Sequence, residues 1–91
     1  MSSGIHVSPD HLAEVGSQFR RASTESEQIL GRLAHSVHSL ESEWSGVTAQ
    51  HFFQDFEQWE KAMRELNAML ESVGVEIGNV AERFRQADQQ G

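Results

Sequence analysis

Histidine and carboxylate residues recur at helical spacing in the middle of this 91-residue chain. His35, His38 and Glu41 follow one another at intervals of three, and His51 precedes Asp55 by four, so each set would share one face of a helix. Imidazole and carboxylate groups at such intervals can bind a metal ion. No His-Glu-x-x-His pattern accompanies them and the chain has no cysteine, so we expect surface histidines and no metal site.

Catalytic machinery is equally absent from the sequence pattern. We find no nucleophile with a base and an orienting residue, and no glycine-rich phosphate loop. The chain is also predicted, as described below, to form only two helices, and two helices leave no concave pocket for a substrate. We therefore expect a protein that is not an enzyme and that needs no cofactor.

Charge and hydropathy argue against two classes of partner. Acidic residues outnumber basic ones by 14 to 7, and the basic residues are scattered, so nucleic acid is not an expected partner. Bulky apolar residues form only short runs such as Phe52-Phe53, which predicts no stable insertion into a membrane. The same pattern predicts no signal peptide, so export would follow a route without a cleaved leader.

The first of two predicted helices begins at Ser8-Pro9-Asp10. Ser8 can cap the helix, Pro9 suits the first helical position, and Asp10 faces the positive end of the helix dipole. Apolar and small residues then recur at steps of three or four, which predicts a helix over about 8–43. The residues expected in its core or at a dimer interface are Phe19, Ile29, Leu33 and Leu40.

The second predicted helix has a more regular stripe. Between residues 52 and 87 the apolar positions alternate strictly at steps of four and three, which is typical of coiled-coil-like packing. The pattern predicts a helix over about 48–87 and a frayed polar tail over 88–91. The residues expected in its core or at a dimer interface are Phe52, Phe56, Trp59, Met63, Leu66 and Leu70.

Trp44-Ser45-Gly46 separates the two helices, almost at the midpoint of the chain. Gly46 can adopt a positive φ without a steric penalty, so the chain can reverse within a few residues, over about 44–47. Trp44 would then pack across the tip. The predicted fold is all-α: a single domain, 1–91, folded as an antiparallel two-helix hairpin.

The apolar stripes are wider than the seam of one hairpin requires. Adjacent pairs such as Ile29-Leu30 and Met69-Leu70 extend over one edge of each stripe. A thin rod about 50 Å long would leave that edge in water. Docking two hairpins covers it, so we predict an elongated antiparallel four-helix bundle in which more than about 2,000 Å² is buried between the hairpins.

The midpoint and the start of the chain resemble the WxG family of small type VII secretion substrates, the Esx or early-secreted-antigen-like proteins. Trp44-Ser45-Gly46 matches the family tripeptide, and Thr48, Ala49 and Phe52 match its context of small residues followed by an aromatic one. The segment 5–12 resembles the start of homodimeric members from Gram-positive bacteria. The resemblance covers nearly the whole chain.

The C-terminal region resembles the export signal of the same family, an aromatic residue followed four positions later by Asp or Glu. Phe84 and Asp88 match it, although Phe stands where Tyr is usual. The resemblance implies secretion as a folded antiparallel homodimer that the membrane ATPase of the secretion machine recognises. Phe84 would enter an apolar pocket on that ATPase, and Asp88 would accept a hydrogen bond or pair with a cation.

An antiparallel dimer would place the tip of one hairpin near the open end of the other. We therefore hypothesise a composite export signal, made of Trp44 and Gly46 from one chain with Phe84 and Asp88 from its partner. Plainer structural roles stay open, because Trp44 could simply close the bundle and Phe84 also occupies a heptad position.

The residues leave the partner and the biological role open. The second hairpin could be a paralogous WxG protein in place of an identical copy. The chain could also be an adaptor that pairs with a larger helical toxin for export. In a third alternative it perturbs membranes, with its apolar stripes meeting lipid once the dimer opens.

Overall fold

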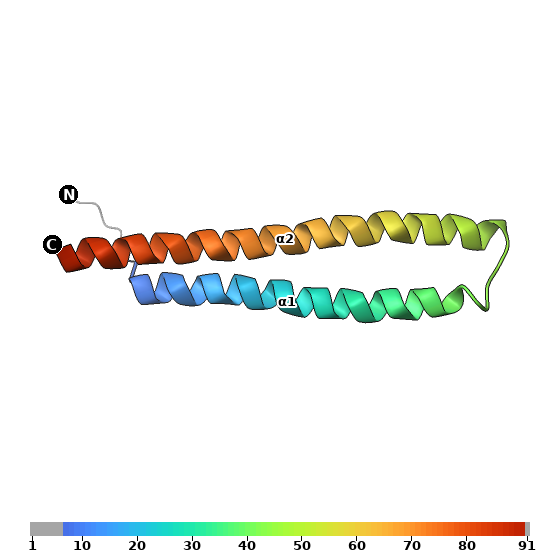
Figure 1. Cartoon of the computed structure of the whole chain (residues 1–91), viewed down its shortest axis with the longest axis horizontal. Coiled ribbons are helices and arrows are strands. Elements are labelled where there is room, and N and C mark those ends of the chain that lie inside the picture. The colour runs from blue at the N-terminus through green and yellow to red at the C-terminus, as the bar shows by residue number, and fades with distance from the viewer. Residues whose placement is uncertain (1–6, 91) are drawn as a thin grey trace.

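The computed structural model describes the backbone of residues 7–90 and the side chains of residues 7–87. Helix α1 spans Pro9–Leu40 and helix α2 spans Val47–Gln90, and the two lie antiparallel along their length (Figure 1). The described residues contain no strand, and they form a rod of 68 × 21 × 16 Å. The predicted all-α hairpin is therefore confirmed.

Helix α1 starts where its capping residues predict. The backbone N–H of His11 donates a hydrogen bond of 2.9 Å to the Ser8 hydroxyl, and Pro9 occupies the first turn. The helix ends at Leu40, three residues before the expected end at 43. After Leu40 the N–H of Glu41 donates to the His38 carbonyl at 3.1 Å and that of Glu43 to the Leu40 carbonyl at 2.9 Å, so tighter bonds to the third residue back replace the α-helical pattern.

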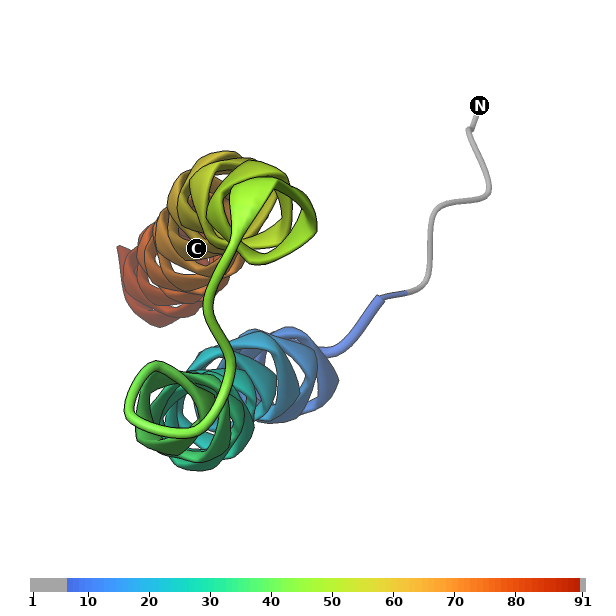
Figure 2. The ribbon, with the colours of Figure 1, turned by 90° about the vertical axis from the view of Figure 1, so that its right-hand side faces the viewer.

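The reversal of the chain occurs at Gly46. Its φ is +109°, the only positive φ among the described residues, and its carbonyl accepts the N–H of Gln50 at 3.0 Å, which opens α2. Figure 2 shows the connection crossing from one helix to the other at the tip. At its far end α2 continues to Gln90, past the expected end at 87, since neither Pro nor Gly interrupts residues 79–90.

The seam inside the hairpin is built from small and polar residues. Most of the buried residues recur at heptad spacing, with Gly16, Ser23 and Leu30 on α1 and Asn67, Gly74 and Ala81 on α2, and Ala34 and Ala49 are buried nearer the tip. Leu30 is the one large apolar residue among the fully buried side chains of the described range. The seam is therefore narrow and depends on close backbone approach rather than on bulky side chains.

The predicted core residues lie beside this seam. Leu66 directly precedes Asn67, and Ile29 directly precedes Leu30, so both are displaced about 100° in the same rotational sense from a buried neighbour. In two antiparallel helices this equal displacement brings both stripes to one side of the hairpin. Four residues of the predicted core set, Phe19, Phe52, Phe56 and Leu70, are half-buried, whereas the other six are exposed.

Candidate functional site

The tip of the hairpin carries a cluster of aromatic rings. The Trp44 ring centroid lies 5.5 Å from that of Phe52 and 5.7 Å from that of Phe53. Phe52 also stacks on Phe56 at 6.5 Å and meets Trp59 edge-on at 6.3 Å. These five residues form the aromatic tip cluster. It closes the turn, yet Trp44 keeps 38% of its surface exposed, so the tip also presents apolar surface to solvent.

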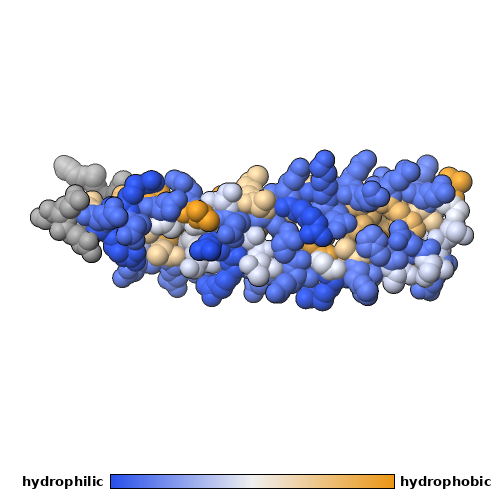
Figure 3. Space-filling model, viewed as in Figure 1, coloured by the Kyte–Doolittle hydropathy of each residue, from blue (hydrophilic) through white to orange (hydrophobic). Residues whose placement is uncertain are grey.

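One long side of the hairpin is apolar and uncovered. Its six members have exposed fractions between 39% and 54% and are Ile29, Leu33, Leu40, Trp59, Met63 and Leu66. We refer to them as the exposed apolar face. An apolar surface that extends along a small protein marks an interaction site. Figure 3 shows a side of the rod on which hydrophilic residues predominate, with apolar residues in scattered patches.

A polar network crosses the seam near the middle of the rod. The Ser23 hydroxyl donates to the Asn67 carbonyl at 2.8 Å, and the Asn67 amide donates to a Glu27 oxygen at 2.8 Å. Arg64 donates to Glu27 and Glu60, again at 2.8 Å each, and the hydrogen bond with Glu60 is the main cause of the raised pKa of Arg64. Asn67 is only 2% exposed, and its Oδ1 has no hydrogen-bond partner. Such a network selects one register of the two helices.

The open end of the hairpin holds the predicted export signal. Phe84 projects from α2 with 42% of its surface exposed. Its neighbour Arg85 donates to an Asp10 oxygen at 2.6 Å, which fastens α2 to the start of α1. The hydrogen bond with Asp10 is the first cause of the raised pKa of Arg85. Asp88 belongs to α2, but its side chain lies outside the described residues.

The two predicted halves of the export signal stand at opposite ends of one chain. Trp44 and Gly46 lie at the tip, and Phe84 lies near the open end of a rod 68 Å long (Figure 1). A single hairpin therefore cannot bring them together. Sequence reasoning located both motifs but missed the Asp10–Arg85 pair and the polar network, because contacts between residues 44 and 75 positions apart leave no periodic signal.

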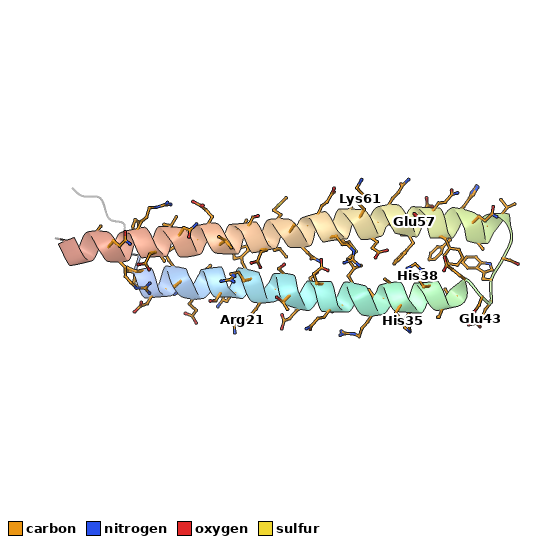
Figure 4. The ribbon with its side chains drawn as sticks, in the orientation of Figure 1. Arg21, His35, His38, Glu43, Glu57 and Lys61 are labelled. Atoms are coloured by element: carbon orange, nitrogen blue, oxygen red, sulfur yellow. The ribbon has the colours of Figure 1, made fainter. Side chains whose placement is uncertain are left out.

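The described histidines lie at different positions along the two helices. His38 Nδ1 lies 3.4 Å from Glu41 Oε1, while His35 points away from α2 in Figure 4. Over residues 7–87 no group of three or more His, Asp or Glu side chains could hold a metal ion. Neither helix of the described range has a stretch that is both long and apolar enough to cross a membrane.

Comparison with known proteins agrees with the fold and the tip motif. Residues 4–89 match the family model WXG100, proteins of 100 residues with WXG. The chain belongs to the WXG100 family. A WXG100 relative, protein YukE of Bacillus subtilis (strain 168), is 25% identical over 89 residues, which are 98% of this chain and 92% of YukE. The WxG resemblance is thus confirmed.

Solved structures of Esx proteins share the hairpin. The secreted protein EsxB from Bacillus anthracis str. Sterne matches with a TM-score of 0.83 and 29% identity, covering 96% of this chain and 99% of EsxB. EsxA from Geobacillus thermodenitrificans matches with a TM-score of 0.84 and 26% identity, covering 99% of this chain and 97% of EsxA. The WXG100 tripeptide of this chain is Trp44-Ser45-Gly46, at the tip of the hairpin.

Proposed function

We propose that this WXG100 protein is a substrate of a type VII (Esx) secretion system, exported as a folded antiparallel homodimer without a cleaved signal peptide. It acts without catalysis, and the membrane ATPase of the secretion machine recognises it. Family membership and the likeness to the secreted protein EsxB support this function. The observation that carries it is the position of the WxG tripeptide at the tip of an apolar-sided hairpin.

The exposed apolar face supports the homodimer. Burying one large apolar side chain contributes about 1.5–3 kcal/mol, and six such residues lie in water on the isolated chain. The seam within the hairpin buries mainly small and polar residues, so one hairpin alone has a weak core. A second copy supplies the missing apolar contacts, as in other bundles made from paired hairpins.

The separation of the two motifs supports a signal made by two chains. Trp44 and Phe84 stand at opposite ends of one hairpin, so an antiparallel partner is needed to bring the tip near the open end. In this arrangement Trp44 and Gly46 of one chain and Phe84 and Asp88 of the other form one composite surface. The ATPase would then select assembled dimers over unpaired chains.

Export into the culture medium tests the signal. We expect Trp44→Ala, Phe84→Ala and Asp88→Ala each to reduce the secreted fraction at least tenfold while the protein stays dimeric by light scattering. Val75→Ala is the matched control, since Val75 is an exposed apolar residue of α2 outside both motifs. Normal export of the Phe84 and Asp88 variants would refute the C-terminal half of the signal.

The exposed apolar face also suits a second function, that of an adaptor for a larger helical protein. Light scattering of the purified chain separates the two. A stable dimer favours the homodimeric substrate, whereas a monomer or an aggregate favours the adaptor. A membrane-perturbing role would use the same face, and it predicts leakage from lipid vesicles at neutral or acidic pH.

A further inference from the structure

The spacing of the apolar row of α2 is the same when it is followed from either end. Its ten members alternate at steps of four and three around residue 68, and they are Phe52, Phe56, Trp59, Met63, Leu66, Leu70, Val73, Ile77, Val80 and Phe84. Residue 68 is also close to the middle of the helix, Val47–Gln90. A half-turn about that point would superpose the row on itself, which is what packing against an antiparallel copy requires.

The central part of helix α1, residues 15–33, has the same property around residue 24. Phe19 and Ile29 lie at equal distances from this position, and so do Val15 and Leu33. Residue 24 is near the middle of α1, Pro9–Leu40. Each helix therefore has a centre of symmetry at its own midpoint.

The contacts within the hairpin bring the two centres to one level of the rod. Ser23 and Asn67, which directly precede residues 24 and 68, are joined by a hydrogen bond of 2.8 Å. Arg20 and Glu71 lie 3.4 Å apart one turn further along. The periodicity of either helix alone does not require the two midpoints to lie at the same level of the rod. It allows one two-fold axis to serve both helices.

We infer that the second copy docks with its two-fold axis at the level of residues 24 and 68. This register rests on the proposed homodimer and deepens it by naming the contacts. Helix α2 packs on its own copy, with Leu66 against the partner's Leu70 and Trp59 against the partner's Ile77. At each end Phe84 lies over the partner's Phe52, the ring that the Trp44 of that same partner contacts.

Charge supports this register along the outer edge of the interface. The row beside the apolar residues of α2 is exposed and consists of Asp55, Ala62, Met69, Glu76 and Arg83. This row is centred on residue 69, one residue from the axis. Asp55 therefore lies within about 3 Å, along the rod, of the level of the partner's Arg83, and opposite charges meet. Met69 faces its own copy, which covers a side chain that is 60% exposed on one chain.

A register shifted by one heptad covers less apolar surface. If the axis moved toward the tip by half a heptad, Val80 and Phe84 would extend past the partner's first aromatic residue and stay in water. Phe84 and Phe52 would no longer meet, and Asp55 would face the partner's Glu76. The central register is the one that pairs all ten residues of the row.

Single-cysteine cross-linking tests the register, because the natural chain has no cysteine. Met69→Cys and, on α1, Glu25→Cys lie beside the axis, so each should cross-link to its own copy under mild oxidation or with a short bis-maleimide. Ala62→Cys should fail alone but cross-link when mixed with Glu76→Cys before refolding. Ala68→Cys is the matched control. It is exposed at the same level but about 100° away on the helix, and it should not cross-link.

The alternatives give different patterns. Efficient cross-linking between Ala62→Cys and Met69→Cys, with little Met69 self-linking, would show the shifted register. Self-linking at every position of the row would show a parallel dimer. On a protein that is dimeric by light scattering, the shifted pattern overturns the register alone. The parallel pattern also overturns the antiparallel arrangement of the proposed homodimer, and a monomer overturns the homodimer itself.

Discussion

Gly16 and Gly74 face each other across the seam at a distance that leaves no room for a side chain. A Cβ atom on Gly16 would lie 2.9 Å from the Gly74 carbonyl oxygen, and one on Gly74 would lie 2.7 Å from the Gly16 carbonyl oxygen. Cβ atoms essentially never approach other heavy atoms so closely. This contact brings the helices together toward the open end and keeps bulky residues out of the seam there.

Gly74→Ala should therefore destabilise the protein. The new methyl group meets backbone atoms of α1 that cannot rotate away, and such overpacking costs about 1–3 kcal/mol. Gly31→Ala is the control, since a Cβ there has no neighbour within 4 Å. This substitution also replaces a glycine that weakens the helix, which should stabilise the protein by up to about 1 kcal/mol. Thermal unfolding at one protein concentration should lower Tm for the first variant and raise it for the second. Equal shifts would contradict the close contact.

Leu66→Asp should dissociate the dimer. Leu66 lies on the exposed apolar face with 52% of its surface in water on one chain, and two copies of the new carboxylate would enter the interface. Losing both leucines costs about 3–6 kcal/mol, so the dissociation constant should rise at least about 100-fold. Val75→Asp is the control, because Val75 is 43% exposed but nine residues away, about 180° around α2. Sedimentation equilibrium measures both, and equal effects would exclude this face as the interface.

Asn67→Ala should cost more stability than Ser23→Ala. Asn67 is almost fully buried and its amide donates to Glu27, so truncation opens a cavity and removes that donor, for about 1–3 kcal/mol. Ser23→Ala loses only its hydrogen bond to the Asn67 carbonyl, about 1 kcal/mol. Ser39→Ala, which breaks an exposed bond within α1, should change stability by less than about 0.5 kcal/mol. Urea unfolding at fixed protein concentration provides the comparison. Equal losses of unfolding free energy in all three variants would show that the network does not stabilise the fold.

Arg85→Gln should lower Tm in a way that depends on salt but not on pH near neutrality. The hydrogen bond with Asp10 raises the pKa of Arg85 in the folded protein. The contribution of Arg85 to folding stability is therefore complete below its pKa in the unfolded chain, and it is lost only as pH rises through its pKa in the folded protein. Both values lie far above neutrality, so the effect should be equal at about pH 6 and about pH 9. It should shrink in high salt, since the pair is exposed. Arg20→Gln, whose contact with Glu71 is 3.4 Å, should have a smaller effect.

The helices and the turn could be predicted from residues that are close together along the chain. Ser8 and Pro9 predicted where α1 begins, the four-three spacing predicted two long helices, and Gly46 predicted the reversal. These features depend on interactions between residues that are close in sequence, so the spacing of residue types is enough to predict them. The helix ends were less certain, because the closing hydrogen bonds to Leu40 and the persistence of α2 to Gln90 have no sharp sequence signal.

Which residues are buried between the two helices could not be predicted, because it depends on contacts between distant parts of the chain. Periodicity shows that an apolar stripe lies on one side of a helix, but it does not say what covers that stripe. Close contact between Gly16 and Gly74, and the buried Asn67, rotate the helices so that Leu30 is 1% exposed and the adjacent Ile29 is 48% exposed. The rotation depends on steric fit between distant parts of the chain. It leaves the bulky stripe free for a partner, and the rod holds Trp44 and Phe84 at opposite ends.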